Sequence, residues 1–188
     1  SGSVIPIFHN QIASGSAVTL TDREMTRFIM SIHKSVSLIL DSAGEAKGGE
    51  VFVTKMPVVR IEDLATAMIE EVAPQYGKKP EEIKITEIGT KPGEKLYEEL
   101  MNDEETRRTI ELQKFFSILP AYRGIYNDIA YKYSATVSKT VTDPYISEQQ
   151  QPLTITEIKT FLKNNNLLGE PEEVTEKRYW PGDKEEKS

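Results

Sequence analysis

The residues of this sequence best suited to chemistry are a lysine and a glutamate three positions apart at a Pro-Gly corner, Lys91-Pro92-Gly93-Glu94. Pro92 fixes one backbone angle, and Gly93 permits the positive φ that a Pro-Gly turn usually requires. An ammonium group beside free backbone N–H donors suits a phosphate, and a neighbouring carboxylate suits a sugar hydroxyl. A turn followed by an ordinary helix cap explains the same residues, because Pro-Gly corners with flanking charges are common.

Arg27 is the second candidate, because it is the one charged side chain in the apolar run over residues 25–30. Burying a guanidinium group without a partner costs on the order of several kcal/mol. Arg27 must therefore meet either a carboxylate of the chain or an external anion. Asp22 and Glu24 offer local partners, so the residues alone leave both alternatives open.

Regular elements on both sides of the Pro-Gly corner are needed to position it. A strand is expected over residues 83–88 and a helix over 96–101, which makes the corner a strand-to-helix turn. Upstream, a short apolar strand over 50–53 and a helix over 61–76 with one apolar stripe precede that strand. The order strand, helix, strand is typical of a βαβ unit in a parallel sheet.

Two further helices are indicated by apolar spacing and by capping residues. One begins at Ser31, and the other opens with the capping box Thr154-Ile155-Thr156-Glu157. The positions expected to face the core are Ile32, Val36, Ile39, Leu40 and Ala43 in the first helix, and Ile155, Ile158, Phe161 and Leu162 in the second.

The remaining segments are shorter or less regular. A short helix over residues 9–14 is expected to end at Gly15 in the left-handed conformation, before a strand over 17–21. A single strand is expected over 111–119. Residues 121–151 lose all periodicity, so we expect them to form an extended arm or loop rather than core.

Composition narrows the class of protein. The 188-residue chain has a formal net charge of -7 and no stripe of Lys and Arg, so no nucleic-acid partner is expected. It has no cysteine, which excludes disulfides and thiolate metal sites, and its two histidines, His9 and His33, lie far apart. His9 is expected at the surface. Because no signal segment and no apolar run of about 18 residues occurs, we expect a cytoplasmic protein with no membrane partner.

The sequence contains no G-x-G-x-x-G, no G-x-x-x-x-G-K-[ST], no G-x-S-x-G and no Tyr-x-x-x-Lys pair. Its 30 Asp and Glu residues fall mostly on helix faces expected to be solvated. The residues alone therefore indicate an α/β module that can bind an anion and shows no visible catalytic machinery.

Four motifs occur in order along the chain: Gly2-Ser3-Val4-Ile5-Pro6-Ile7-Phe8, Met25-Thr26-Arg27-Phe28, Gly49-Glu50-Val51-Phe52-Val53, and Lys91-Pro92-Gly93-Glu94-Lys95-Leu96-Tyr97-Glu98-Glu99-Leu100-Met101. Together they resemble the C-terminal half of the UDP-N-acetylglucosamine 4,6-dehydratase and epimerase family of polysaccharide biosynthesis, whose members are extended short-chain dehydrogenases. The resemblance covers about residues 1–119. It implies an α/β fold that is the C-terminal part of an extended short-chain dehydrogenase, with an incomplete Rossmann-type sheet, a small α/β substrate domain and a C-terminal arm.

The resemblance also implies a division of the chain and roles for particular residues. The expected parts are a UDP-sugar-binding portion (1–120), an extended arm (121–151), a capped helix (152–169) and a mobile tail (170–188). The resemblance implies that the planar guanidinium of Arg27 binds two oxygens of the diphosphate and that Lys91 adds a point charge there. It also implies that Glu94 accepts hydrogen bonds from the ribose hydroxyls. The implied nucleotide pocket is completed by Val4, Ile5, Pro6 and the backbone of Thr19 and Leu20.

In the family, the glycine loop, the NAD or NADP site and the Tyr-x-x-x-Lys couple lie in the half that precedes residue 1. The resemblance therefore implies that this chain binds no cofactor alone, is inactive alone, and has a UDP-sugar, the missing half and a second copy of itself as partners. It also implies that residues 51–53 and the helix over 61–76 add to the nucleotide-binding sheet, so that the isolated chain self-associates or is marginally stable. Two other functions stay open: a stand-alone, non-catalytic nucleotide-sugar-binding module, and an oligomerisation module whose arm wraps a neighbour.

Overall fold

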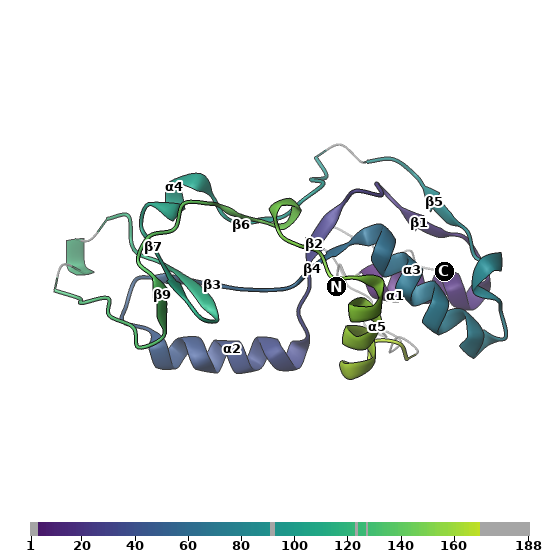
Figure 1. Cartoon of the computed structure of the whole chain (residues 1–188), viewed down its shortest axis with the longest axis horizontal. Helices are drawn as coiled ribbons and strands as arrows, with labels where there is room; N and C mark the ends of the chain where they lie inside the picture. Colours follow the sequence, from purple (N-terminus) through teal and green to yellow (C-terminus); the bar gives the residue numbers. More distant parts are fainter. Residues whose placement is uncertain (1–3, 91–92, 123, 127, 170–188) are drawn as a thin grey trace, which may run out of the picture.

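The computed structural model describes residues 4–90, 93–122, 124–126 and 128–169. Over these residues the chain forms an elongated molecule of two lobes, with β2 and β4 at the junction (Figure 1). The helices are α1 (Val4–Ser14), α2 (Ile32–Glu45), α3 (Ile61–Val72), α4 (Asp103–Thr106) and α5 (Ile155–Asn164), with 3₁₀ turns at Ala73–Tyr76, Pro80–Glu82, Gly124–Tyr126 and Ser147–Gln149.

The strands are short and fall into four small sheets. They are β1 (Val18–Leu20), β2 (Thr26–Phe28), β3 (Val51–Thr54), β4 (Val58–Arg60), β5 (Ile85–Glu87), β6 (Glu99–Met101), β7 (Thr109–Leu112), β8 (Phe115–Ile118), β9 (Thr136–Ser138) and β10 (Tyr145–Ile146). None of the helices described has both the length and the apolar composition that crossing a membrane requires.

The first lobe is built around α3, which packs against α1 and α5 (Figure 1). The helix predicted over 61–76 is confirmed: it runs as α3 followed by a 3₁₀ turn, and its apolar stripe is buried. The buried residues are Ile61, Leu64, Ala65, Ala67, Met68, Ile69, Val72 and Ala73. The parallel strands β1 and β5 complete this lobe.

Two predicted helix ends in this lobe are confirmed. Gly15 ends α1 with a φ of 77°, in the left-handed region that glycine occupies without strain. The capping box is present at α5, where the Thr154 hydroxyl accepts from the Glu157 N–H at 3.3 Å and the Glu157 carboxylate accepts from the Thr154 N–H at 2.8 Å. Ile158 and Leu162 are then fully buried.

His9 is buried rather than exposed, so the prediction of a surface position is wrong. The reason is that α1 begins at Val4, not at residue 9, and one of its faces packs on α3 and the following 3₁₀ turn. The His9 ring meets the ring of Tyr76 edge to face, with centroids 5.7 Å apart.

The second lobe is an antiparallel sheet in the order β3-β8-β7-β9, with α2 packed on one face. The predicted βαβ unit over residues 50–88 is wrong, because β3 pairs antiparallel with β8 while β5 pairs with β1 in the other lobe. The single strand predicted over 111–119 is a hairpin of β7 and β8. Short apolar runs show that a strand exists, but not which strand it pairs with.

The helix predicted to begin at Ser31 is confirmed as α2, and the Ser31 side chain accepts from the Lys34 N–H at 3.3 Å. Its predicted core face is wrong. The one buried residue of α2 is Leu38, which packs with Phe52 and Phe115 of the sheet. The positions expected in the core point away from the sheet, because a helical stripe does not reveal which partner it faces.

Residues 96–101 form no helix, although their composition favours one. Glu99–Met101 is strand β6, and it pairs antiparallel with β10. Met101 is fully buried on the second face of the sheet, beside Ile118 and Tyr145. Tertiary pairing therefore overrides the local helix propensity.

Residues 121–151 contribute to the core, contrary to the expectation of an arm without core contacts. Tyr133, Tyr145 and Ile146 are buried, and β9 and β10 both join sheets. Burial raises the pKa of Tyr133 to about 12, and the Tyr133 hydroxyl accepts from Ser117 Oγ at 2.9 Å. Tyr145 accepts from the Met56 N–H at 2.8 Å, and burial raises the pKa of its phenol.

Candidate functional site

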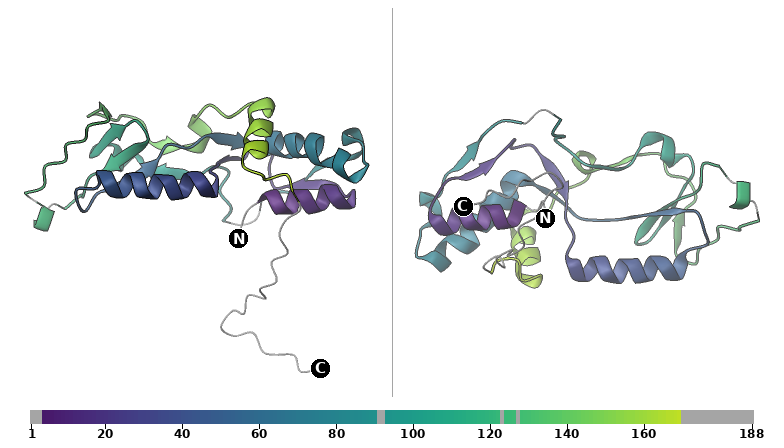
Figure 2. Two further views of the ribbon diagram at one scale, coloured as in Figure 1. Left: turned by 90° about the horizontal axis from the view of Figure 1, so that it is seen from below. Right: turned by 180° about the vertical axis from the view of Figure 1, so that it is seen from behind.

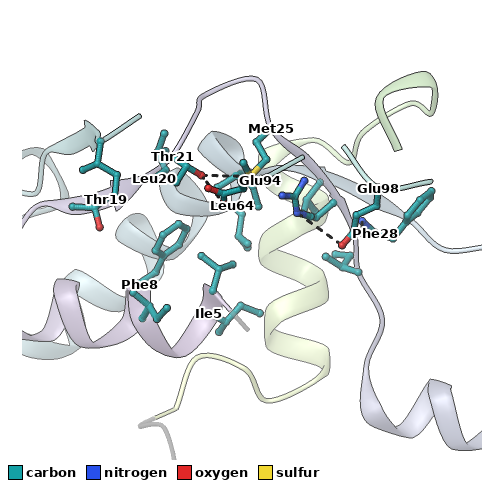
Figure 3. Close-up of a pocket in the computed structure, with 17 residues that line it drawn as sticks. Ile5, Phe8, Thr19, Leu20, Thr21, Met25, Phe28, Leu64, Glu94 and Glu98 are labelled. Atoms are coloured by element: carbon teal, nitrogen blue, oxygen red, sulfur yellow. Dashed lines mark hydrogen bonds and ion pairs between the residues drawn. The ribbon is translucent and has the colours of Figure 1, made fainter. Parts of the chain in front are cut away.

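A pocket of about 540 Å³ lies in the first lobe, where α1, the end of β1 and the junction strand β2 meet. Figure 3 shows Ile5 and Phe8 of α1 on one side and Thr21 and Glu94 across from them. The walls are mainly apolar, and the charged groups that line them are Arg27, Glu94 and Glu98. An apolar cavity with a few convergent polar groups is the usual form of a small-molecule site.

Arg27 enters the pocket from β2, opposite Val59 of β4. Its Nη1 donates to the carbonyl of Thr26 and its Nη2 to the carbonyl of Lys95, both at 2.8 Å. Asp22 and Glu24 are not its partners; Arg27 forms a long ion pair with Glu98, whose Oε1 lies 3.8 Å from Nε. Because each terminal nitrogen carries two hydrogens, the two carbonyls leave one N–H on each of them for another acceptor.

Glu94 reaches the same pocket from the Pro-Gly corner. Its Oε1 accepts from the Thr21 hydroxyl at 3.3 Å. Gly93 has a φ of 84°, so the positive φ predicted for the corner is confirmed. Arg27 and Glu94, far apart in the sequence, therefore line one cavity.

The corner does not open a helix, so the predicted helix N–H donors for a phosphate are absent from residues 93–98. What the corner supplies is the Lys95 carbonyl that orients Arg27. Lys91 and Pro92 lie outside the described residues, so the predicted role of Lys91 stays a prediction.

The apolar residues predicted for the nucleotide pocket divide into two groups. Val4 and Ile5 line the cavity together with Thr19 and Leu20, whereas Pro6 does not. Two of the backbone groups expected at the uracil edge already have partners. The Thr19 N–H donates to Gln11 Oε1 at 3.1 Å, and the Leu20 carbonyl accepts from the Ile88 N–H at 2.8 Å.

Glu98 and Ser147 were missed by sequence reasoning, and both hold the pocket together. The Glu98 carboxylate accepts from the Phe28 N–H at 2.9 Å, next to Arg27 on β2. The Glu98 N–H donates to Ser147 Oγ at 2.9 Å, and that oxygen also lies 2.8 Å from Thr26 Oγ1. Ser147 is fully buried. No sequence pattern links Ser147 to Thr26, which lies 121 residues away.

The fold and the pocket define an α/β chain in which a guanidinium and two carboxylates line one cavity together with an apolar wall. Residues 1–120 match the model of a family described as polysaccharide biosynthesis protein. The chain belongs to this family.

Individual relatives agree with the family match. The chain is 44% identical over 167 residues to an uncharacterized membrane protein of Methanocaldococcus jannaschii, a match that covers 89% of this chain and 46% of that protein. It is 51% identical over 105 residues to the capsular polysaccharide biosynthesis protein CapD of Staphylococcus aureus, covering 55% of this chain and 17% of CapD. It is 38% identical over 164 residues to the UDP-glucose 4-epimerase of Rickettsia prowazekii (strain Madrid E), covering 86% of this chain and 45% of the epimerase.

A solved structure shows the same fold. The X-ray structure of Pen from Bacillus thuringiensis superposes with a TM-score of 0.76 at 39% identity, over 89% of this chain and 47% of Pen. The predicted fold class, an α/β part of an extended short-chain dehydrogenase, is confirmed. The chain spans about half the length of several relatives that it matches.

Proposed function

We propose that this chain is the UDP-sugar-binding portion of a UDP-N-acetylglucosamine 4,6-dehydratase or epimerase of surface polysaccharide biosynthesis. Membership of the polysaccharide biosynthesis family supports the pathway class. The similarity to proteins named UDP-glucose 4-epimerase supports a sugar nucleotide as the ligand. The observation that carries the proposal is the fixed position of Arg27 in the pocket.

The Arg27 guanidinium is oriented before any ligand arrives. Two backbone carbonyls hold its terminal nitrogens, and one N–H on each is left to face an acceptor. Two N–H donors on one planar guanidinium can bind two oxygens of a diphosphate. Pre-orientation also lowers the entropy that binding costs, because the side chain is already ordered.

Glu94 and the apolar wall fit the rest of a uridine nucleotide. The Glu94 carboxylate accepts hydrogen bonds only, which suits ribose hydroxyls as donors. Val4, Ile5, Thr19 and Leu20 provide a surface against which a base and sugar can pack. The cavity volume of about 540 Å³ is in the usual range for small-molecule sites.

NAD or NADP, which the resemblance implies for the longer enzymes, does not fit this chain. A dinucleotide requires a strand, a glycine loop and a helix N-terminus in succession, and the sequence has no G-x-G-x-x-G. We assign the cofactor and the Tyr-x-x-x-Lys couple to the portion that the relatives have beyond this match. On this proposal the chain alone is inactive, and its role is to position the sugar nucleotide. The proposal also includes a cytoplasmic location and a homo-oligomeric enzyme.

Isothermal titration calorimetry with UDP tests the proposal. Wild type should bind UDP, and Arg27→Ala should weaken binding roughly 10- to 100-fold. A loss of this size corresponds to the free energy that hydrogen bonds to a charged group contribute. Arg23→Ala is the matched control, because Arg23 pairs with Glu62 and Glu87 and does not line the pocket. No UDP binding by wild type, or equal binding by wild type and Arg27→Ala, would refute the proposal.

A stand-alone oligomerisation module is the second candidate, and the exposed apolar face of α2 favours it. That function gives no reason for an oriented arginine in an apolar cavity. It predicts self-association without any UDP binding, so the same titration separates the two candidates.

A further inference from the structure

A cavity of about 520 Å³ lies in the second lobe, at the end of the sheet where β7 begins and where β8 and β9 end. In every view β7 and β9 lie in the lobe opposite α1, so this cavity is far from the pocket that Arg27 lines (Figure 1, Figure 2). The two cavities share no lining residue. A ligand of one therefore need not be a ligand of the other.

Four basic side chains from three separate segments line this second cavity, which we call the basic cavity. They are Arg107, Arg108, Lys132 and Lys139. Among the described residues of its lining none is acidic, although the formal net charge of the chain is -7. Like charges that are brought together repel one another, so an anion bound between them is stabilised by all of them.

Arg108 is the innermost of the four and already has partners. Its Nη1 donates to the Leu119 carbonyl at 2.5 Å, and its Nη2 lies 3.4 Å from Glu104 Oε2 and 3.7 Å from Glu105 Oε1. Its Nε is buried and has no hydrogen-bond partner among the described residues. Arg108 is therefore held in place by the protein, and its charge is partly compensated.

The other three basic residues are exposed and available. Arg107, Lys132 and Lys139 form no ion pair with any residue that the structure describes. Lysine carries three N–H donors and arginine five, and neither side chain can accept. The rim of the basic cavity therefore offers many donors and three positive charges to an external anion.

The wall that carries Lys132 is anchored to the rest of the lobe. The hydroxyl of its neighbour Tyr131 donates to the Gly48 carbonyl at 2.7 Å, 83 residues away in the sequence. Ile110, Leu119 and Ile129 supply an apolar part of the lining. Cations above an apolar surface suit an organic molecule with charged phosphate groups.

We propose that the basic cavity is a second ligand site, for a soluble small molecule that carries two or more phosphate groups. Three available cations exceed what a single monovalent anion requires, and phosphate oxygens accept charge-assisted hydrogen bonds from both lysine and arginine. The four basic residues are spread over positions 107–139, which is why no stripe of Lys and Arg is visible in the sequence.

Isothermal titration calorimetry with pyrophosphate tests the site. Arg27→Ala is the background for every protein, so that the first pocket contributes little; Arg27→Gln replaces it if the alanine variant does not fold. Lys132→Gln/Lys139→Gln removes two charges from the basic cavity. Lys114→Gln/Lys163→Gln is the matched control, because it removes two charges from exposed lysines outside both cavities. A cooperative urea transition checks that each protein is folded.

We expect the background protein to bind pyrophosphate and the Lys132→Gln/Lys139→Gln variant to bind it at least ~10-fold more weakly, because two charged donors are lost. The control should stay within about twofold of the background. No pyrophosphate binding by the background protein, or an equal loss in the control, would overturn the inference. Sedimentation with phosphatidylglycerol vesicles examines a lipid source of the same phosphate chemistry. Vesicle binding without pyrophosphate binding would assign the basic cavity to a membrane surface and also overturn the inference.

Discussion

Backbone carbonyls orient the Arg27 guanidinium, while its carboxylate partner Glu98 stays at a longer distance. Its terminal nitrogens bind the carbonyls of Thr26 and Lys95, while Glu98 stands 3.8 Å from Nε. Two uncharged acceptors fix the direction of the guanidinium, and the one carboxylate that pairs with it does so at 3.8 Å through Nε. A shorter carboxylate pair at the terminal nitrogens would compete more strongly with an anionic ligand.

Arg27→Lys tests whether the fork geometry matters in addition to the charge. A lysine keeps the charge but cannot span two carbonyls and two ligand oxygens at once. We expect UDP affinity to fall by roughly 5- to 20-fold by calorimetry, less than for alanine. An affinity equal to that of wild type would show that Arg27 acts as a simple point charge.

Ser147 joins the segment after the Pro-Gly corner to the strand that carries Arg27. Ser147→Ala removes the acceptor of the Glu98 N–H and the partner of the Thr26 hydroxyl. We expect a loss of about 1–3 kcal/mol in the free energy of unfolding, measured in urea, because a buried polar group loses its partner. Ser37→Ala, at an exposed position of α2, should stay within about 0.5 kcal/mol of wild type. Equal effects of the two substitutions would contradict this role of Ser147.

The site residues that could be predicted from sequence are those that carry their own chemical signal. An arginine inside an apolar run and a glutamate beside Pro-Gly stand out locally, and both line the pocket. Glu98 resembles the other glutamates around it, and Ser147 lies in a stretch without periodicity. Their roles depend on hydrogen bonds between distant segments, which no local pattern encodes.

At the scale of the elements, helices α2 and α3 carry similar apolar stripes and have opposite surroundings. Both were predicted as helices, and both exist. The stripe of α3 is buried, whereas that of α2 is exposed. The spacing of apolar residues therefore predicted that each segment is a helix. It did not predict what each helix face packs against, because that depends on tertiary contacts.

Two adjacent residues of α2 give the matched test of this packing. Leu38→Ala should cost about 2–3 kcal/mol of unfolding free energy, because Leu38 fills the space between α2 and the sheet. Ile39→Ala should change it by at most about 0.5 kcal/mol, because that side chain is already solvated. Urea unfolding of this chain measures both. A larger loss for Ile39→Ala than for Leu38→Ala would contradict the observed orientation of the helix.

The capping box of α5 makes its contribution to stability dependent on pH. The backbone N–H and the hydroxyl of Thr154 donate to Glu157 and lower the pKa of its carboxyl below the ordinary value of 4.5. A carboxyl whose pKa is lower in the folded chain stabilises the fold above its unfolded pKa, and this stabilisation is lost as the pH falls through the folded pKa.

Glu157→Gln keeps the shape of the cap but does not titrate. The stability of wild type relative to this variant should be constant between about pH 7 and 5, and should decrease below about pH 4.5. Urea unfolding at several pH values measures the difference. A difference that grows on acidification, or that does not change, would contradict the cap described here.

At the scale of the whole molecule, the two lobes differ in how far their elements are covered by neighbouring elements. In the first lobe, the α1, α3 and α5 helices enclose one core and the pocket lies at its edge. In the second lobe, a four-stranded sheet has packed side chains on both faces, yet the outer edges of β3 and β9 and one face of α2 have no partner in the described residues. The family resemblance correctly predicted the fold class, but the predicted βαβ unit failed because β3 and β5 belong to different lobes.

The central claim is that Arg27 binds the diphosphate of a uridine nucleotide, and comparing two ligands tests it most directly. UDP and uridine differ in the diphosphate, so each is titrated against wild type and Arg27→Ala. We expect the substitution to weaken UDP roughly 10- to 100-fold and to leave uridine within about twofold of wild type. Equal losses for both ligands, or no loss for UDP, would contradict the assignment.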